Sequence, residues 1–152
     1  MSLETGPLKL SDAAAAADLE RECFSDPWSL ETVEQTIRRA EEGAGALSCG
    51  AFGVWEEERL IGVLFSMAVA GEGELHRIAV DAAHRGRGAA LALMEAFFRW
   101  LKDCGCNTAF LEVREGNLPA IRLYEKCGFV LYGRRKGYYH APEEDALLFR
   151  YQ

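Results

Sequence analysis

One acidic residue stands inside an apolar segment of this chain: Glu112 follows Phe110 and Leu111 and precedes Val113. A carboxylate in a buried strand is unfavourable unless it has a partner or faces a cleft. In a cleft it can accept a proton from a reacting group, as a general base. Two less specific interpretations stay open: Glu112 could lie at the solvent-exposed end of the strand, or it could pair with Arg114.

Polar residues recur at helical spacing just after this segment. Asn117, Ala120 and Tyr124 are three and four residues apart, so they lie on one face of a helix that begins near Leu118. Asn117 could cap this helix, or its amide could bind a ligand. The Tyr124 hydroxyl could donate a proton, although a helical tyrosine is more often a core aromatic residue.

A turn with two glycines connects an apolar strand, which ends at Val80, to a long helix. Gly86 and Gly88 have no Cβ, so the backbone can bend sharply there, and the first N–H groups of the helix point at any anion bound in the turn. Arg85 and Arg87 add positive charge. A phosphate-binding turn is one interpretation, and an ordinary turn with solvated arginines is the other.

Two common phosphate-binding motifs do not fit this turn. The dinucleotide-binding fingerprint Gly-x-Gly-x-x-Gly requires glycine at the position of Leu91, and the P-loop requires Gly-Lys followed by Ser or Thr. The turn contains Arg-x-x-Gly-x-Ala instead, formed by Arg85, Gly88 and Ala90.

The elements that must position these residues are predicted from hydrophobic periodicity along the whole chain. The predicted strands are Leu8–Leu10, Leu47–Trp55, Arg59–Val69, Glu74–Val80, Thr108–Val113, Phe129–Tyr139 and Asp145–Tyr151. The predicted helices are Asp12–Phe24, Leu30–Glu41, a segment from the glycine turn to Gly105, and Leu118–Lys126. Together they predict an α/β protein with a mixed sheet flanked by helices.

Length, charge and composition restrict the class of protein. The chain has 152 residues, 49% hydrophobic and 27% charged, which fits a single domain over residues 1–152. Its formal net charge of −7 disfavours nucleic acid as a partner and favours a cationic acceptor. No apolar segment approaches the roughly 20 residues of a membrane helix, and no secretion signal is present, so we expect a cytoplasmic protein with no membrane partner. The five cysteines form no Cys-x-x-Cys motif and are expected to be reduced.

Two segments together resemble the GCN5-related N-acetyltransferase (GNAT) superfamily, whose members bind acetyl-CoA on an Arg/Gln-x-x-Gly-x-Gly/Ala turn. The segment from Leu111 to Phe129 is similar to the RimI-type branch, bacterial enzymes that acetylate the N-terminal alanine of a small-subunit ribosomal protein. Agreement continues through Asp26-Pro27-Trp28-Ser29, Arg134-Arg135, Tyr138-Tyr139 and Glu144-Asp145-Ala146. The resemblance spans nearly the whole chain. It implies the GNAT fold, a single mixed, mostly antiparallel sheet of about six or seven strands, flanked by about four helices and splayed at the acetyl-CoA site.

The resemblance also implies a role for each matching residue. Glu112 is implied to take a proton from the acceptor amine, and Tyr124 to protonate the CoA sulfur. Backbone N–H groups in the last strand before the turn are implied to bind the pantetheine arm and polarise the acetyl carbonyl, beside a local bulge. No metal is required. The implied acetyl-CoA contacts are Ile78, Ala79, Val80, Arg85, Gly86, Arg87, Gly88, Ala89, Ala90, Leu91, Asn117 and Tyr124.

The implied acceptor is a protein N-terminal amine, with a monomer or weak dimer as the expected assembly. Trp28, Arg134, Tyr138 and Tyr139 are expected to shape its site, which would take an extended basic tail. Two alternatives stay open, because fold and cofactor site do not fix the acceptor. One is an acetyltransferase for a small amine, such as a polyamine, amino acid or antibiotic, and the other is a CoA-binding module without activity.

Three residues depart from the family pattern. Ala90 replaces the commoner final glycine of the turn, where a methyl group is tolerated. His76 and Arg77 bring polar side chains to a strand that is usually more apolar, and we expect them to border the acceptor cleft. The three histidines, His76, His84 and His140, are assigned no catalytic or metal-binding role, because no fitting nucleophile or ligand spacing accompanies them.

Overall fold

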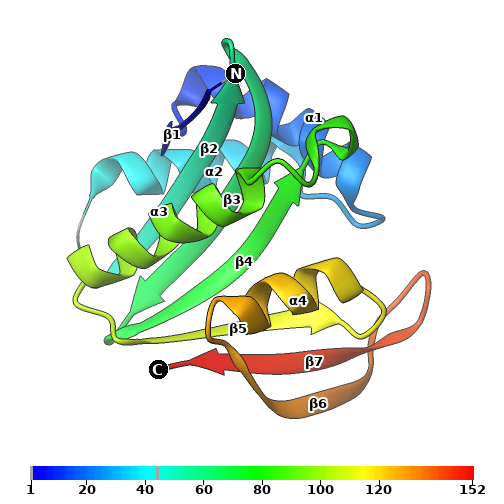
Figure 1. Ribbon diagram of the computed structural model, residues 1–152. Coiled ribbons are helices and arrows are strands. Elements are labelled where there is room, and N and C mark those ends of the chain that lie inside the picture. Colours follow the sequence, from blue (N-terminus) through cyan, green and yellow to red (C-terminus); the bar gives the residue numbers. More distant parts are fainter. Residues whose placement is uncertain (1, 44) are drawn as a thin grey trace.

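The computed structural model describes residues 2–43 and 45–152, and its centre is a seven-stranded sheet (Figure 1). The strands lie in the order β1-β2-β3-β4-β5-β7-β6, and only β4 and β5 run parallel to each other. They are β1 (Leu3–Pro7), β2 (Leu47–Glu56), β3 (Arg59–Val69), β4 (Glu72–Val80), β5 (Thr108–Arg114), β6 (Val130–Tyr139) and β7 (Glu144–Tyr151). The mixed, mostly antiparallel sheet predicted from the sequence is confirmed.

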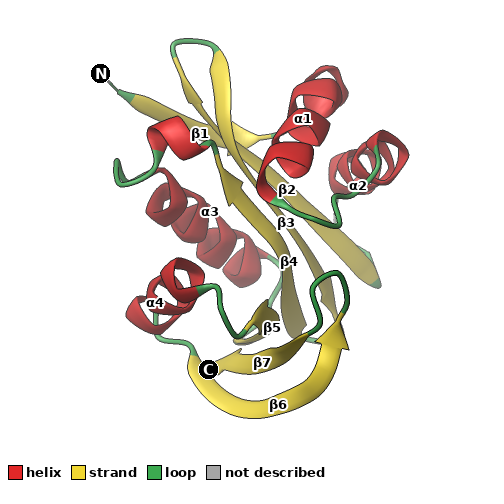
Figure 2. Ribbon diagram, turned by 90° about the vertical axis from the view of Figure 1, so that its right-hand side faces the viewer, coloured by secondary structure: helices red, strands yellow, loops and turns green. Residues whose placement is uncertain are grey.

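The α-helices in the described part of the chain cover both faces of this sheet (Figure 2). α1 (Ala13–Cys23) and α2 (Leu30–Glu42) lie on one face, and α3 (Ala89–Asp103) and α4 (Leu118–Lys126) lie on the other. Each face has its own cluster of buried apolar side chains, which includes Phe65 on the α1 side and Phe97 on the α3 side. Burial of this apolar surface stabilises the fold by about 25 cal/mol per Å².

The sheet is splayed between its two parallel strands. Glu72–Leu75 of β4 pair with Thr108–Leu111 of β5, and the pairing ends there. Beyond Leu75, β4 and β5 diverge, which is visible as the gap between their arrowheads in Figure 1. The second half of β4 therefore pairs with β3 but not with β5.

A bulge in β4 lies at the start of this splayed part. Phe65 on β3 pairs with Arg77, and the next residue, Ser66, pairs with Leu75, so His76 is the extra residue. The local bulge implied by the resemblance is therefore present, two residues before Ile78.

The N-terminal segment differs from the prediction. The sequence predicts a strand at Leu8–Leu10, but β1 lies earlier, at Leu3–Pro7, and Leu10–Asp12 form a short 3-10 helix. The prediction is wrong because the apolar Leu8 does not belong to a strand. Its side chain is buried in the cluster beneath α1 and α2. β1 is an edge strand that pairs with β2 through its backbone, and its side chains show little apolar pattern.

The other predicted helices and strands are found within two residues of their predicted ends. All five cysteines are free thiols, as predicted. Among the described residues, none of the helices has the length and apolar character needed to span a membrane.

Candidate active site

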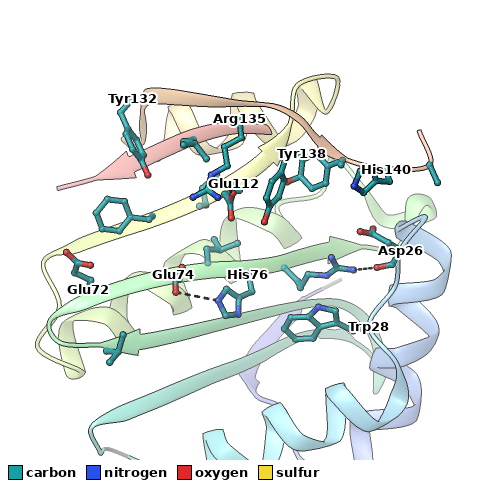
Figure 3. A pocket seen from close by; sticks show the side chains of 18 residues that line it. Asp26, Trp28, Glu72, Glu74, His76, Glu112, Tyr132, Arg135, Tyr138 and His140 are labelled. Atoms are coloured by element: carbon teal, nitrogen blue, oxygen red, sulfur yellow. Dashed lines mark hydrogen bonds and ion pairs between the residues drawn. The ribbon is translucent and has the colours of Figure 1, made fainter. Parts of the chain in front are cut away.

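A cleft opens where β4 and β5 separate (Figure 3). Its volume is about 1120 Å³, and its walls come mainly from the α1–α2 connection, β4, β5 and β6. Several lining residues remain solvent-exposed, among them Tyr132 and Tyr138, at 52% and 43%. The cleft is therefore open to a large ligand and not closed around a small one.

Glu112 lies on the cleft side of β5. Its neighbour Leu111 points to the opposite face, into the core beneath α3 and α4, because side chains alternate along a strand. The Glu112 side chain is 37% exposed, and its Oε2 lies 3.5 Å from Nε of Arg135 on β6. Arg114, the partner that the sequence left open, pairs with Glu144 instead, at 3.3 Å. The Glu112 carboxylate is thus accessible from the cleft, as a general base must be.

Tyr124 lies on the other face of the sheet, in α4. It is 4% exposed, and its ring centroid lies 5.9 Å from that of Phe129. Burial, with smaller contributions from nearby Tyr139 and Cys127, raises the pKa of the Tyr124 hydroxyl far above its ordinary value. The phenol therefore keeps its proton at neutral pH, as a hydrogen-bond or proton donor requires.

Two adjacent tyrosines at the end of β6 form another part of the cleft wall. The rings of Tyr138 and Tyr139 lie 5.1 Å apart at 81°. The guanidinium of Arg114 lies 4.4 Å from the Tyr139 ring, and that of Arg135 lies 5.5 Å from the Tyr138 ring. Burial, followed by the negative charge of Glu112, raises the pKa of Tyr139 to about 12. Tyr139 therefore stays neutral beside Glu112 at neutral pH.

The glycine turn lies between β4 and α3. Gly86 and Gly88 have φ values of 79° and 85°, and nothing lies within 4 Å of a Cβ built on either residue. Glycine is therefore favoured by backbone conformation and not by crowding. Gly88 is the N-cap of α3, so the N–H groups of Ala89, Ala90 and Leu91 open the helix and have no carbonyl partner within it. This geometry fits a bound phosphate group.

The two arginines of the turn have protein partners. Arg85 Nε donates to the carbonyl oxygen of Val80 at 3.1 Å, and Arg87 pairs with Glu56 on β2. The Arg85 charge lies beside the turn and favours an anion there, whereas Glu56 offsets the charge of Arg87. The N–H groups at the helix start supply the directional donors.

Asn117 caps α4, which is one of the two roles that the sequence allows for it. Its Oδ1 accepts a hydrogen bond from the Ala120 N–H at 3.3 Å. An asparagine amide also carries two N–H donors, and the cap does not use them. A ligand contact by the same side chain is therefore compatible with the cap.

Of the four residues predicted to bind the acceptor, three lie in the cleft wall and one does not. Three of them line the cleft: Trp28, Tyr138 and Tyr139. Arg134 is not among the lining residues, and it pairs with Glu115 and Asp145, both at 2.7 Å. Its neighbour Arg135 lines the cleft instead, because successive side chains of a strand point to opposite faces. The pattern of the sequence does not show which of two adjacent arginines faces the cleft.

The sequence prediction also missed a buried ion pair that borders the cleft. Glu20 in α1 is fully buried, and its Oε1 lies 2.6 Å from Nη2 of Arg77. A signal was present, because Glu20 follows the buried Ala13, Ala16 and Ala17 at helical spacing and so lies on the apolar face of α1. A carboxylate on that face requires a partner.

Comparison with known proteins agrees with this geometry. Residues 13–129 match the acetyltransferase (GNAT) family. The chain is 31% identical over 143 residues to the ribosomal protein bS18-alanine N-acetyltransferase of Escherichia coli (strain K12), a match that covers 93% of this chain and 91% of the relative. It is 30% identical over 148 residues to the N-alpha-acetyltransferase RimI of Mycobacterium tuberculosis, covering 95% and 89% of the two chains.

The crystal structure of the ribosomal-protein-S18-alanine N-acetyltransferase from Escherichia coli has the same fold, with a TM-score of 0.84 at 28% identity over 99% of this chain and 93% of that chain. The match to the family covers more than half of the sequence. This chain therefore belongs to the acetyltransferase (GNAT) family.

Proposed function

We propose that this protein is an acetyl-CoA-dependent N-α-acetyltransferase that acetylates a protein N-terminus. One observation carries the proposal: the accessible carboxylate of Glu112 lies in an open cleft where β4 and β5 separate, and the buried phenol of Tyr124 lies on the opposite face of the sheet. An amine and a thioester approaching from the two faces would meet in this gap. The names of the relatives suggest the N-terminal alanine of ribosomal protein bS18 as the acceptor.

Glu112 is proposed to prepare the nucleophile. An α-amino group has a reference pKa of about 7.7 to 8.0, so most of it is protonated at neutral pH. Glu112 takes one proton from this ammonium group, directly or through a water molecule. The amine nitrogen then bonds to the acetyl carbonyl carbon as the carbon–sulfur bond breaks. The backbone N–H groups within Ile78–Val80 that point away from β3 are proposed to stabilise the negative charge that develops on the carbonyl oxygen.

Tyr124 is proposed to assist the leaving sulfur. A thiol has a reference pKa of about 8.5, which is below that of the buried Tyr124 hydroxyl. Tyr124 therefore stabilises the developing thiolate chiefly by donating a hydrogen bond. The nitrogen loses a second proton when the amide forms, and the sulfur gains one proton to become the free thiol, so the two balance.

The glycine turn is proposed to hold the pyrophosphate of acetyl-CoA, which supplies the activated acetyl group. Gly86 to Leu91 offer main-chain N–H groups at the start of α3, with the charge of Arg85 beside them. The pantetheine arm would follow the unpaired side of β4, and the Asn117 amide would bind near the thiol end.

The charges of the cleft support a cationic acceptor. The carboxylates in its lining are Asp26, Glu72, Glu74 and Glu112, and the arginines are Arg77 and Arg135. Arg77 is neutralised by Glu20, which lies outside the lining, and Arg135 pairs with Glu112. The remaining negative charge attracts a protonated N-terminus that is followed by basic residues.

The open cleft also argues against the two alternative functions, a small-amine acetyltransferase and a CoA-binding module without activity. An enzyme for a small amine is expected to close around it, whereas this cleft is wide and partly lined by exposed residues. A CoA-binding module without activity needs neither an accessible carboxylate nor a buried phenol.

We further propose that residues 1–152 act as one domain in the cytoplasm. The packing of both hydrophobic clusters on one sheet supports a single domain, and the free thiols support the cytoplasm.

The proposal is tested by mass spectrometry of acetyl transfer from acetyl-CoA to a basic peptide that begins with alanine. The controls are the same peptide with a blocked N-terminus and a panel of polyamines. We expect one acetyl group on the free peptide and none on its blocked twin. Acetylation of the polyamines alone would move the function to small-molecule metabolism.

A further inference from the structure

Glu20 is a fully buried carboxylate near the end of α1, and its partners come from two other parts of the chain. Its Oε1 accepts hydrogen bonds from the backbone N–H of Trp28 at 2.8 Å and from Nη2 of Arg77 at 2.6 Å. Nε of Arg77 lies 3.2 and 3.3 Å from the two carboxylate oxygens. Burying a charge is unfavourable unless it is both paired and hydrogen-bonded, and Glu20 meets both conditions.

Arg77 contacts the α1–α2 connection at three residues. Its Nη2 donates to the carbonyl oxygen of Asp26 at 3.0 Å, a bond drawn dashed in Figure 3. Its guanidinium lies 4.0 Å from the ring centroid of Phe24 and 5.5 Å from that of Trp28. The Arg77 side chain is only 15% exposed, so water screens these contacts weakly.

The bulge in β4 makes these contacts possible. In a regular strand, His76 and Arg77 would point to opposite faces. Because His76 is an extra residue, both side chains lie on the α1–α2 side, where His76 packs against Trp28 at 6.2 Å between ring centroids and Arg77 reaches Glu20.

The connection held in this way is one wall of the acceptor cleft. Asp26 and Trp28 line the cleft, and the Trp28 ring packs against Phe65 with centroids 5.2 Å apart. Phe24–Ser29 form neither a helix nor a strand, so no regular backbone ladder fixes them. Their position depends on side-chain contacts, and Glu20 and Arg77 provide two of the polar ones, to the Trp28 N–H and the Asp26 carbonyl oxygen.

We propose that the Glu20–Arg77 ion pair is a positioning device for the acceptor: it holds Phe24–Trp28 in place as the wall against which the acceptor chain binds. This inference rests on the proposed function, because it assigns the cleft to the acceptor. Neither residue touches the reacting atoms. Neither residue belongs to the glycine turn, and both lie on the α1–α2 side of β4. We therefore expect loss of the pair to weaken acceptor binding and to change acetyl-CoA binding little.

The test uses steady-state kinetics with the alanine peptide and acetyl-CoA varied in turn. The main variant is Glu20→Gln with Arg77→Met, which removes both charges and leaves no lone buried charge. Arg77→Lys keeps the positive charge beside Glu20 without the planar fork of the guanidinium group. Arg21→Gln is the matched control, because Arg21 lies next to Glu20 on α1 and is 58% exposed in a pair with Asp18.

In the double variant we expect the KM for the peptide to rise by about tenfold, with kcat and the KM for acetyl-CoA within about twofold of wild type. Arg77→Lys should recover part of the loss, and Arg21→Gln should behave as wild type. Hydrogen exchange followed by mass spectrometry should show faster exchange in Phe24–Trp28 and unchanged exchange in β3.

Two results would overturn the inference. One is a wild-type KM for the peptide in the double variant. The other is a parallel change in kcat and both KM values, with faster exchange throughout the chain, which would mean that the pair serves the fold as a whole. Should the wild-type protein not acetylate the peptide at all, the proposed function fails, and the exchange in Phe24–Trp28 alone then decides whether the pair positions this wall.

Discussion

The glycine turn and the acceptor cleft are built in different ways. The turn is a short continuous segment, Arg85–Ala90, whose shape comes from two glycines with positive φ and from the helix that follows. The cleft combines side chains from the α1–α2 connection, β4, β5 and β6, which meet only because the sheet is paired in one order and splayed at one point. A site made by local backbone conformation can be recognised from a motif, whereas a site assembled across strands depends on register. Substitutions in the two regions should therefore change different kinetic constants.

The largest effect is expected from Glu112→Gln in the cleft. Loss of the general base should lower kcat/KM for the alanine peptide by about 10² to 10³-fold and leave the Kd of acetyl-CoA unchanged. Glu115→Gln is the control, because Glu115 lies close by in the sequence but pairs with Arg134 outside the cleft. Stopped-flow or discontinuous assays at pH 7.5 suffice. A kcat/KM within threefold of wild type would place the base elsewhere.

Tyr124→Phe tests the hydrogen bond proposed for the leaving sulfur, on the face of the sheet opposite the cleft. Removal of one hydroxyl keeps the ring packing against Phe129 and removes the hydrogen bond proposed for the leaving sulfur. We expect kcat to fall by about 10²-fold, with the KM for the peptide little changed. Tyr151→Phe, in the same aromatic cluster, should leave kcat unchanged. An unaffected kcat in Tyr124→Phe would show that the sulfur leaves without this group.

Gly88→Ala tests the turn. At a φ of 85° a residue with a Cβ costs about 1 to 2 kcal/mol, although no atom lies within 4 Å of the added methyl. The Kd of acetyl-CoA, measured by calorimetry, should rise by about tenfold as the turn adjusts. Gly6→Ala is the control, since its Cβ also meets open space, without a positive φ. A change in the KM for the peptide alone would contradict the division between turn and cleft.

Two substitutions of Asn117 distinguish its role as the helix cap of α4 from a direct contact with acetyl-CoA. Asn117→Ala should lower the free energy of unfolding by about 1 kcal/mol, while Asn117→Ser should keep the cap and most of the stability. If the amide also binds acetyl-CoA, both variants should raise its Kd by about threefold. A Kd unchanged in Asn117→Ser, from the same calorimetric measurement, would leave Asn117 with the cap alone.

The smallest effect concerns alkaline pH. The pKa of Tyr139 is raised to about 12 in the folded protein, whereas an unfolded tyrosine titrates near pH 10. Between these values the folded state holds more protons than the unfolded state, so stability is complete below about pH 10 and falls as the pH rises toward 12. Tyr139→Phe should reduce this fall, as measured by urea unfolding between pH 9 and pH 11. Identical slopes in both proteins would contradict the assignment.

Most of the fold was predictable because the apolar pattern of each helix and strand is strong and local. The exceptions have a common cause. Leu8 is apolar because it belongs to the buried cluster that includes Ala51 and Val63, not because it belongs to a strand. Glu20 is a carboxylate on the apolar face of α1 because its partner Arg77 comes from β4. In both cases a residue type reflects a neighbour that is distant in the sequence.

The sequence by itself determined the family, the glycine turn and the candidates Glu112 and Tyr124, because each depends on residues close together in the chain. Only the tertiary structure decided that Arg135 and not Arg134 faces the cleft, that Asn117 caps α4, and that a bulge at His76 turns Arg77 toward Glu20. The physical reason is register. A shift of one residue along a strand reverses the face on which every later side chain lies, and pairing with a neighbouring strand sets that register.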